Sequence, residues 1–218
     1  MTAVPAKRGA PRTDATLATA TRAVPANRYA VFLLLAVTGC ALDLATKTWI
    51  FNEFGGPREK PTWWLWNGVC GFQTSLNEGA LFGMGQGRVV LFAGLSIVVV
   101  PCVLYWLFVV GAARDLLLTI ALGLVTAGIL GNLYDRLGLP GLAWRDPWIV
   151  GGLHQVGDPV YAVRDWILVM IGNWPWPTFN VADSLLVSGA ILLVWHALWY
   201  TPEEPSARGN GPANAASG

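Results

Sequence analysis

The stretch LLLTIALGLVTAGILGNLYDR, residues 116–136, decides the fold class of this chain. Its first eighteen residues carry no charged side chain, and an apolar run of about 20 residues is what an α-helix needs to cross a bilayer. Polar side chains then gather at its end, as Asn132, Asp135 and Arg136. Ionisable groups there are costly unless they are paired, hydrated or used. The stretch therefore predicts a membrane-spanning helix that ends in a functional site.

Three further apolar runs approach the same length, at residues 29–51, 89–110 and 182–199. The chain is 54% hydrophobic and only 12% charged, whereas a typical globular domain has about 25% charged residues. These features predict an all-α membrane protein with four transmembrane helices. The net charge of +1 excludes a basic nucleic-acid-binding face. Three Cys residues and two His residues have no metal-ligand spacing, so the sequence indicates neither a metal nor another cofactor.

The chain divides into a membrane domain and two polar tails. Residues 1–28 and 201–218 are rich in small and polar residues and are predicted to be disordered, and residues 29–200 form the membrane domain. The first tail carries five Lys and Arg residues, which favours a cytoplasmic location under the positive-inside rule. An even number of spans then places both termini in the cytoplasm. The loops at 52–88 and 137–181 are predicted to be extracytoplasmic.

On this map the polar residues collect at the outer end of the helices. Asp43 and Lys47 lie in the outer half of the first span, four residues apart, at a spacing that allows a structural ion pair. Asn77 follows in the first outer loop, and Asn180 and Asp183 open the last span. This concentration at one membrane face predicts a site there.

Two features also have purely structural interpretations. Asn180 stands where a helix N-cap is expected, a role that by itself needs no function. Gly123, Ala127 and Gly131 are spaced four residues apart, which predicts a stripe of close helix packing.

Nearby carboxylates suggest the chemistry. Two carboxyl groups held close together do not both ionise readily, so one keeps a proton while the other stays charged. Such a pair can activate a water molecule and protonate a departing amine, as in aspartic proteolysis. The candidates are Asp135, Asp165 and Asp183. Asp183 is the firmest, because its helix must start at the outer face, and physical reasoning alone leaves Asp135 and Asp165 open as its partner.

Five motifs in this order together resemble the signal peptidase II (lipoprotein signal peptidase) family. They are LDLATK at 42–47, NEGALFG at 77–83, GNLYDR at 131–136, VRDW at 163–166 and FNVADS at 179–184. The resemblance covers roughly residues 29–200. It implies four helices with a small extracytoplasmic cap that contains short β-strands.

The resemblance also implies an activity and a location. The family comprises aspartic endopeptidases of the bacterial inner membrane, which are inhibited by globomycin and use no metal or other cofactor. They remove the signal peptide from diacylglyceryl-modified prolipoproteins by cutting just before the lipidated Cys. The expected partners are therefore these prolipoproteins and the membrane lipids.

Carried over by motif, the resemblance makes Asp165 and Asp183 the catalytic pair. It places four further residues along the site or against the substrate: Asn77, Asn132, Arg136 and Asn180. Asp43 and Lys47 match positions at the rim of the site. Asp135 is interpreted as a supporting residue that orients Arg136 or Asn132.

The sequence departs from the family pattern near Asp165. The segment at 137–163 is long and contains Asp146 and Asp158. These two carboxylates compete with Asp165 for the assignment as a catalytic residue. Arg164 stands where the family usually has an aliphatic residue. A cation beside Asp165 would lower the pKa of that carboxyl group, unless the Arg164 side chain points away.

Two other classes of protein stay open. A small proton-coupled transporter or channel subunit also keeps charged residues in the membrane, but usually near the midplane and within inverted repeats, and neither feature is visible here. A structural subunit is the third interpretation, and it would need no second carboxylate near Asp183.

Overall fold

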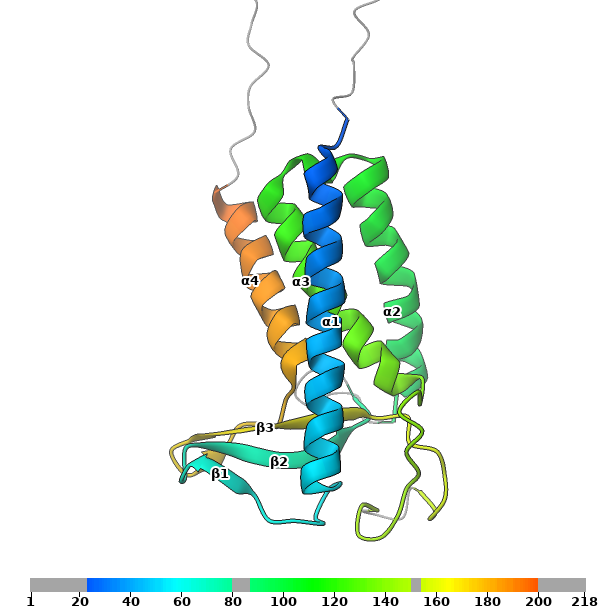
Figure 1. Ribbon diagram of the computed structural model, residues 1–218, viewed down its shortest axis with the longest axis vertical. Helices are drawn as coiled ribbons and strands as arrows, with labels where there is room; N and C mark the ends of the chain where they lie inside the picture. Colours follow the sequence, from blue (N-terminus) through cyan, green and yellow to red (C-terminus); the bar gives the residue numbers. More distant parts are fainter. Residues whose placement is uncertain (1–22, 80–86, 150–153, 200–218) are drawn as a thin grey trace, which may run out of the picture.

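A four-helix bundle stands on a small β-sheet in the computed structural model, which describes residues 23–79, 87–149 and 154–199 (Figure 1). The helices are α1 (Ala26–Phe54), α2 (Val89–Leu104, continued by a π-helical turn at Tyr105–Val109), α3 (Leu116–Arg136) and α4 (Val181–Trp199). Within the described residues, these four are long and apolar enough to cross a membrane. The four spans predicted from the sequence are confirmed.

The helix boundaries correct one prediction. Helix α1 begins at Ala26, so residues 26–28 belong to a helix and not to the predicted tail. Pro25 precedes the helix, and its carbonyl accepts a hydrogen bond from the backbone of Arg28 at 2.9 Å. The rest of the predicted tails lies largely at 1–22 and 200–218, outside the described residues.

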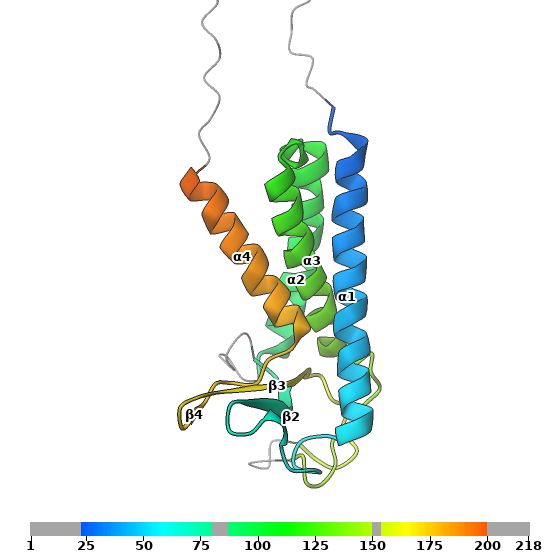
Figure 2. The same cartoon turned by 60° about the vertical axis from the view of Figure 1, so that its left-hand side comes forward.

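Small residues bring the helices of the bundle together around α3. A Cβ atom added to Gly123 would lie 3.2 Å from Leu35 on α1, and one added to Gly131 would lie 2.4 Å from Asp43. The predicted packing stripe is confirmed, and its partner is α1. A second contact joins α3 to α4, where Gly128 faces the Ala182 carbonyl. Helix α4 approaches α3 most closely at the sheet end and leans away at the other end (Figure 2).

The sheet is antiparallel with the strand order β1-β2-β3-β4. Its strands are β1 (Trp63–Trp66), β2 (Cys70–Asn77), β3 (Val163–Ile171) and β4 (Trp174–Pro175). The predicted cap with short strands is confirmed. The sequence interpretation nevertheless left residues 163–171 in a loop, although they form a strand of nine residues. The signal was a run of apolar, β-branched and aromatic side chains, VRDWILVMI, which is typical of a buried strand.

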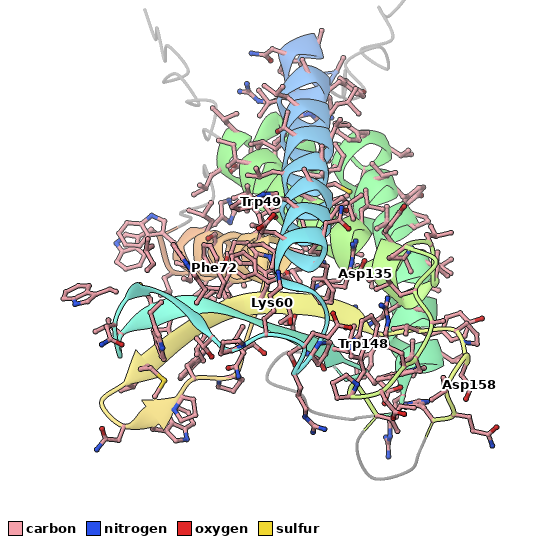
Figure 3. The ribbon with its side chains drawn as sticks, turned by 60° about the horizontal axis from the view of Figure 1, so that its bottom comes forward. Trp49, Lys60, Phe72, Asp135, Trp148 and Asp158 are labelled. Carbon is pink, nitrogen blue, oxygen red and sulfur yellow. The ribbon has the colours of Figure 1, made fainter. Side chains whose placement is uncertain are left out.

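The described parts of the long 137–163 segment, residues 137–149 and 154–163, fold against the sheet and the end of α1. Trp144, Trp148, Val160 and Ala162 form a small hydrophobic cluster. Trp148 packs so closely on Gly56 that a Cβ atom there would lie 2.0 Å from the indole. Figure 3 looks toward the sheet end and shows Trp148 and Asp158 on this segment, beside the strands.

Candidate active site

Two carboxylates from different elements share one polar cluster at the junction of the bundle and the sheet. Asp165 lies on β3 and is 1% exposed. It accepts hydrogen bonds from Asn77 Nδ2 at 3.1 Å and from Asn180 Nδ2 at 2.6 Å. Asp183 lies in the first turn of α4 and accepts from Asn132 Nδ2 at 2.8 Å. Each carboxylate is therefore oriented by amide groups of other elements.

Asn180 and Asn132 connect the two carboxylates. Asn180 Nδ2, which bonds Asp165, also donates to Asn132 Oδ1 at 3.2 Å, and Asn132 in turn bonds Asp183. Asn180 also caps α4, because its Oδ1 accepts from the Asp183 backbone at 2.9 Å and its backbone N–H faces Asp183 Oδ2 at 3.3 Å. This reciprocal pattern is a capping box. The predicted N-cap is confirmed, and the same residue also belongs to the site.

Lys47 connects Asn132 to two further carboxylates, those of Asp43 and Asp135. Its Nζ lies 2.7 Å from Asp43 Oδ2 and 3.1 Å from Asp135 Oδ2, and it donates to Asn132 Oδ1 at 2.9 Å. The side chains of Asp43, Lys47 and Asp135 are completely buried. Asp43 and Lys47 were expected at the rim, and the structure places them beneath the site instead. Asp43 also accepts from the backbone of Ala182 at 2.8 Å, which fixes the start of α4.

Asp135 forms an ion pair and hydrogen bonds with Arg164. Its Oδ1 lies 3.0 Å from Arg164 Nε and 2.9 Å from Arg164 Nη2, while its Oδ2 accepts from the Arg164 backbone at 3.0 Å. Asp135 was expected to orient Arg136 or Asn132, and its contacts are instead with Arg164 and Lys47. Successive side chains of a strand point to opposite faces, so Arg164 points away from Asp165. The predicted lowering of the pKa of Asp165 by Arg164 does not occur.

Burial dominates the electrostatics of Asp165. It raises the pKa of Asp165 to about 8, and the nearby charge of Asp183 acts in the same direction. Lys47 and the hydrogen bonds from Asn180 and Asn77 oppose this shift. At neutral pH the cluster therefore holds a carboxyl group that keeps its proton, which is the arrangement that proteolysis by a carboxyl pair needs.

Arg136 holds the segment that follows β2. It donates to the Gly79 carbonyl at 2.8 Å, and its guanidinium lies 5.6 Å from the centre of the Phe92 ring. Asn77 Oδ1 accepts from the Gly79 backbone at 2.9 Å, so both residues shape this turn. The remainder of the NEGALFG motif, residues 80–83, lies outside the described residues.

The other acidic residues that the sequence raised lie apart from this cluster. Asp146 and Asp158 are exposed on the 137–163 segment, and Asp158 accepts from the Gln155 backbone at 2.8 Å. Among the described residues, no group of three or more His, Cys, Asp and Glu side chains has the geometry of a metal site.

Comparison with known proteins identifies the family. A family model described as "Signal peptidase (SPase) II" matches residues 35–199. The chain is a member of the signal peptidase II family. It is therefore an aspartic peptidase of the signal peptidase II type, embedded in a membrane through its helices, and the transporter alternative is not supported.

Individual relatives agree with this membership. A protein named lipoprotein signal peptidase from Rhodopirellula baltica is 46% identical over 186 residues, which cover 84% of this chain and 78% of the relative. A protein of the same name from Serratia proteamaculans is 30% identical over 83% of this chain and 93% of its own length. Among solved structures, a bacterial membrane enzyme determined by the in meso method at 2.3 Å has the same fold. Its TM-score is 0.61 at 24% identity, over 85% of this chain and 95% of that one.

Proposed function

We propose that Asp165 and Asp183 form the catalytic pair of this signal peptidase II, and that its substrates are diacylglyceryl-modified prolipoproteins cut just before the lipidated Cys. The names of the relatives and the family membership support the removal of signal peptides from prolipoproteins. One observation carries the choice of the pair. The Asn132–Asn180 bridge connects Asp165 with Asp183, whereas Asp135 is already bound by Arg164 and Lys47.

The pair works with one proton. We assign that proton to Asp165, whose pKa is raised by burial and by the nearby charge of Asp183, so that the Asp183 carboxylate serves as the base. The Asp183 carboxylate takes a proton from water as the water oxygen attacks the carbonyl carbon before the Cys, while Asp165 protonates the carbonyl oxygen. When the tetrahedral intermediate collapses, the proton held by Asp183 passes to the departing amine, and Asp165 recovers its own. Asn132, Asn180 and Asn77 keep both carboxyl groups oriented throughout.

The proposed location is the bacterial inner membrane, with both termini cytoplasmic and the site near the outer face. The five cations at residues 1–28 support this orientation. The N-terminal end of α1 and the C-terminal end of α4 both lie at the end of the bundle opposite the sheet (Figure 1). The membrane domain then begins with α1 at Ala26, and the acyl chains of the substrate stay in contact with membrane lipids.

Three single variants test the pair: Asp165→Asn, Asp183→Asn and Asp135→Asn. Cleavage of a purified diacylglyceryl prolipoprotein, followed by gel shift, should fall about 10³-fold or more in the first two. Both should keep a melting temperature close to that of the wild type, because Asn has nearly the size and shape of the Asp side chain that it replaces.

Asp135→Asn should behave differently. It removes the negative charge of Asp135, which forms ion pairs with both Arg164 and Lys47. Leaving a buried cation without its partner costs about 3–5 kcal/mol. Its melting temperature should therefore drop. Full activity in Asp165→Asn together with a stable but inactive Asp135→Asn would move the pair to Asp135 and Asp183. Absence of cleavage by the wild-type protein would overturn the proposed function as a whole.

A further inference from the structure

A polar pocket of about 680 Å³ lies beside the sheet, outside the carboxylate cluster. Three parts of the chain line it: residues 57, 58 and 60–62 after α1, residues 73–76 of β2 with Glu78, and the 137–163 segment through Trp144 and Trp148. His154 and Thr178 complete it. The mechanism proposed above uses none of the side chains that line this pocket.

The pocket is continuous with the catalytic strand pair. Ser75 lines the pocket and is the direct partner of Asp165 across the β2–β3 ladder. Leu76 and Glu78 line it on either side of Asn77, which bonds Asp165. Thr178 lies two positions before Asn180, the other donor to Asp165. A substrate peptide that extends from the carboxylate pair along β2 would therefore enter this pocket.

The walls of the pocket are held in place. His154 stacks on Trp144 with ring centres 4.1 Å apart, and its Nε2 lies 3.0 Å from Glu78 Oε1. Trp148 Nε1 donates to Glu59 Oε1 at 2.8 Å. These contacts tie the 137–163 segment both to the end of β2 and to the turn after α1.

The edge of β2 offers backbone groups to an extended peptide. Strand β1 pairs with β2 only from Cys70 to Phe72. Beyond a register shift between Phe72 and Ser75, Ser75 and Leu76 pair with β3 on one side, and no other described strand pairs with them. All four residues 73–76 line the cavity, which places it along this edge of β2. An unpaired edge of this kind can accept an added strand.

The charges of the pocket favour an acidic peptide. Arg58 donates to the Pro147 carbonyl at 3.3 Å, and Lys60 donates to the Glu53 carbonyl. A backbone carbonyl carries no net charge, so neither hydrogen bond neutralises the cation. No acidic side chain in the described part of the chain forms an ion pair with either of them. Glu78, the acid in the lining, faces His154. Figure 3 labels Lys60 close to the end of α1 and to the sheet.

We infer that this pocket binds the polar segment that follows the lipidated Cys of the substrate, as an added strand along residues 73–76, and that it favours acidic side chains there. The inference rests on the proposed function. The part of the substrate before the Cys is an apolar helix in the membrane, so only the part after it matches a polar pocket on the sheet. The 137–163 segment, through Trp144, Trp148 and His154, then helps to select substrates by the residues that follow the Cys.

Lipopeptides that differ only after the Cys test this inference. One carries two Glu residues in the next few positions, a second carries two Lys residues, and a third ends directly after the Cys. The wild-type protein should cleave the Glu peptide with a kcat/KM about 3- to 10-fold above that of the Lys peptide, the range expected for partly exposed charge pairs. The preference should shrink at high salt.

Variants locate the effect. Arg58→Gln with Lys60→Gln should bring the Glu and Lys peptides to nearly equal kcat/KM and leave the truncated peptide unchanged. Arg88→Gln is the matched control, because Arg88 is exposed at the first residue before α2 and does not line the pocket; it should keep the preference. Equal cleavage of the Glu and Lys peptides by the wild type, or equal loss of preference in the control, would overturn the inference. No cleavage of any of the three peptides would instead count against the proposed function.

Discussion

Asn180 caps α4 and at the same time donates a hydrogen bond to Asp165. A cap places its side chain at the first turn of the helix, and in this chain that turn also holds Asp183. The folding signal and the active site therefore share one residue. Asn132 is similar, since it receives a bond from Lys47 and gives one to Asp183. Amide groups suit this position, because each supplies both a donor and an acceptor.

The pH dependence of cleavage follows from Asp165. Its pKa of about 8 means that the pair loses its single proton above that pH, so kcat/KM should fall on the basic side with an apparent pKa near 8 that belongs to the pair. Asn77 donates to the charged form of Asp165. Asn77→Ala should remove this stabilisation, raise the pKa and move the basic limb to higher pH. A limb that stays in place or moves to lower pH would contradict this account of Asp165.

Arg164 connects strand β3 to helix α3 through Asp135. Its side chain and its backbone both bond Asp135, so the residue next to Asp165 is tied to the bundle on the opposite face of the strand. Helix α4 is set by a different contact, where small residues allow α3 and α4 to touch. The positions of Asp165 and Asp183 thus depend on how β3 and α4 dock on α3.

Arg164→Met should destabilise the protein while leaving the catalytic groups unchanged. Asp135 would lose its main partner, and breaking a buried ion pair costs about 3 kcal/mol or more. The melting temperature should fall, and a second change, Asp135→Asn, should restore part of it. Arg145→Met is the control, because the Arg145 side chain is 55% exposed, and it should have little effect. A melting temperature of Arg164→Met equal to that of the wild type would refute the anchoring role.

Gly128→Ala tests the docking of α4. The added Cβ atom would lie 2.4 Å from the Ala182 carbonyl and 2.7 Å from Leu186, so the first turn of α4 must shift. A displacement of about 1 Å can cost about 10²-fold in rate, and we expect kcat to fall on that scale. Gly94→Ala is the matched control, because an added Cβ atom there meets nothing within 4 Å. Equal activity of the two variants would show that the α3–α4 contact does not position Asp183.

Across the whole molecule, polarity is divided between the two ends. The buried ion pairs, the carboxylate cluster and the polar pocket all lie toward the sheet, where residues 54–79 and 137–180 fold together. At the opposite end, Asp115 caps α3 and faces His196 at 2.8 Å. The proposed orientation puts the sheet end on the outer side of the inner membrane, where a lipoprotein continues after its lipidated Cys.

Reporter fusions test this orientation on the intact protein. A fluorescent protein fused after residue 199 should fluoresce, because it stays in the cytoplasm, and alkaline phosphatase at the same place should be inactive. Phosphatase fused after Leu139 should be active, since that residue lies on the outer segment after α3. The reverse pattern would place Asp165 and Asp183 on the cytoplasmic side and contradict the proposed location.

The four spans, the glycine stripe on α3 and the cap at Asn180 depend on residues within a few turns of one another, so periodicity and length were enough to predict them. The family was evident from the resemblance of five motifs in their order along the chain. Asp183 was also evident, because its place at a helix start follows from the span.

Which acidic residues lie together depends on how distant elements dock. Asp135 and Arg164 are far apart in the chain, and their ion pair engages Asp135, whereas the amide groups of Asn132 and Asn180 connect Asp165 with Asp183. The run VRDWILVMI indicates a strand locally, but its pairing with β2, which lies before two transmembrane helices in the sequence, became evident only from the fold. The pocket needs three distant segments to exist at all. Contacts at such separations depend on how the elements dock, which local sequence patterns do not encode.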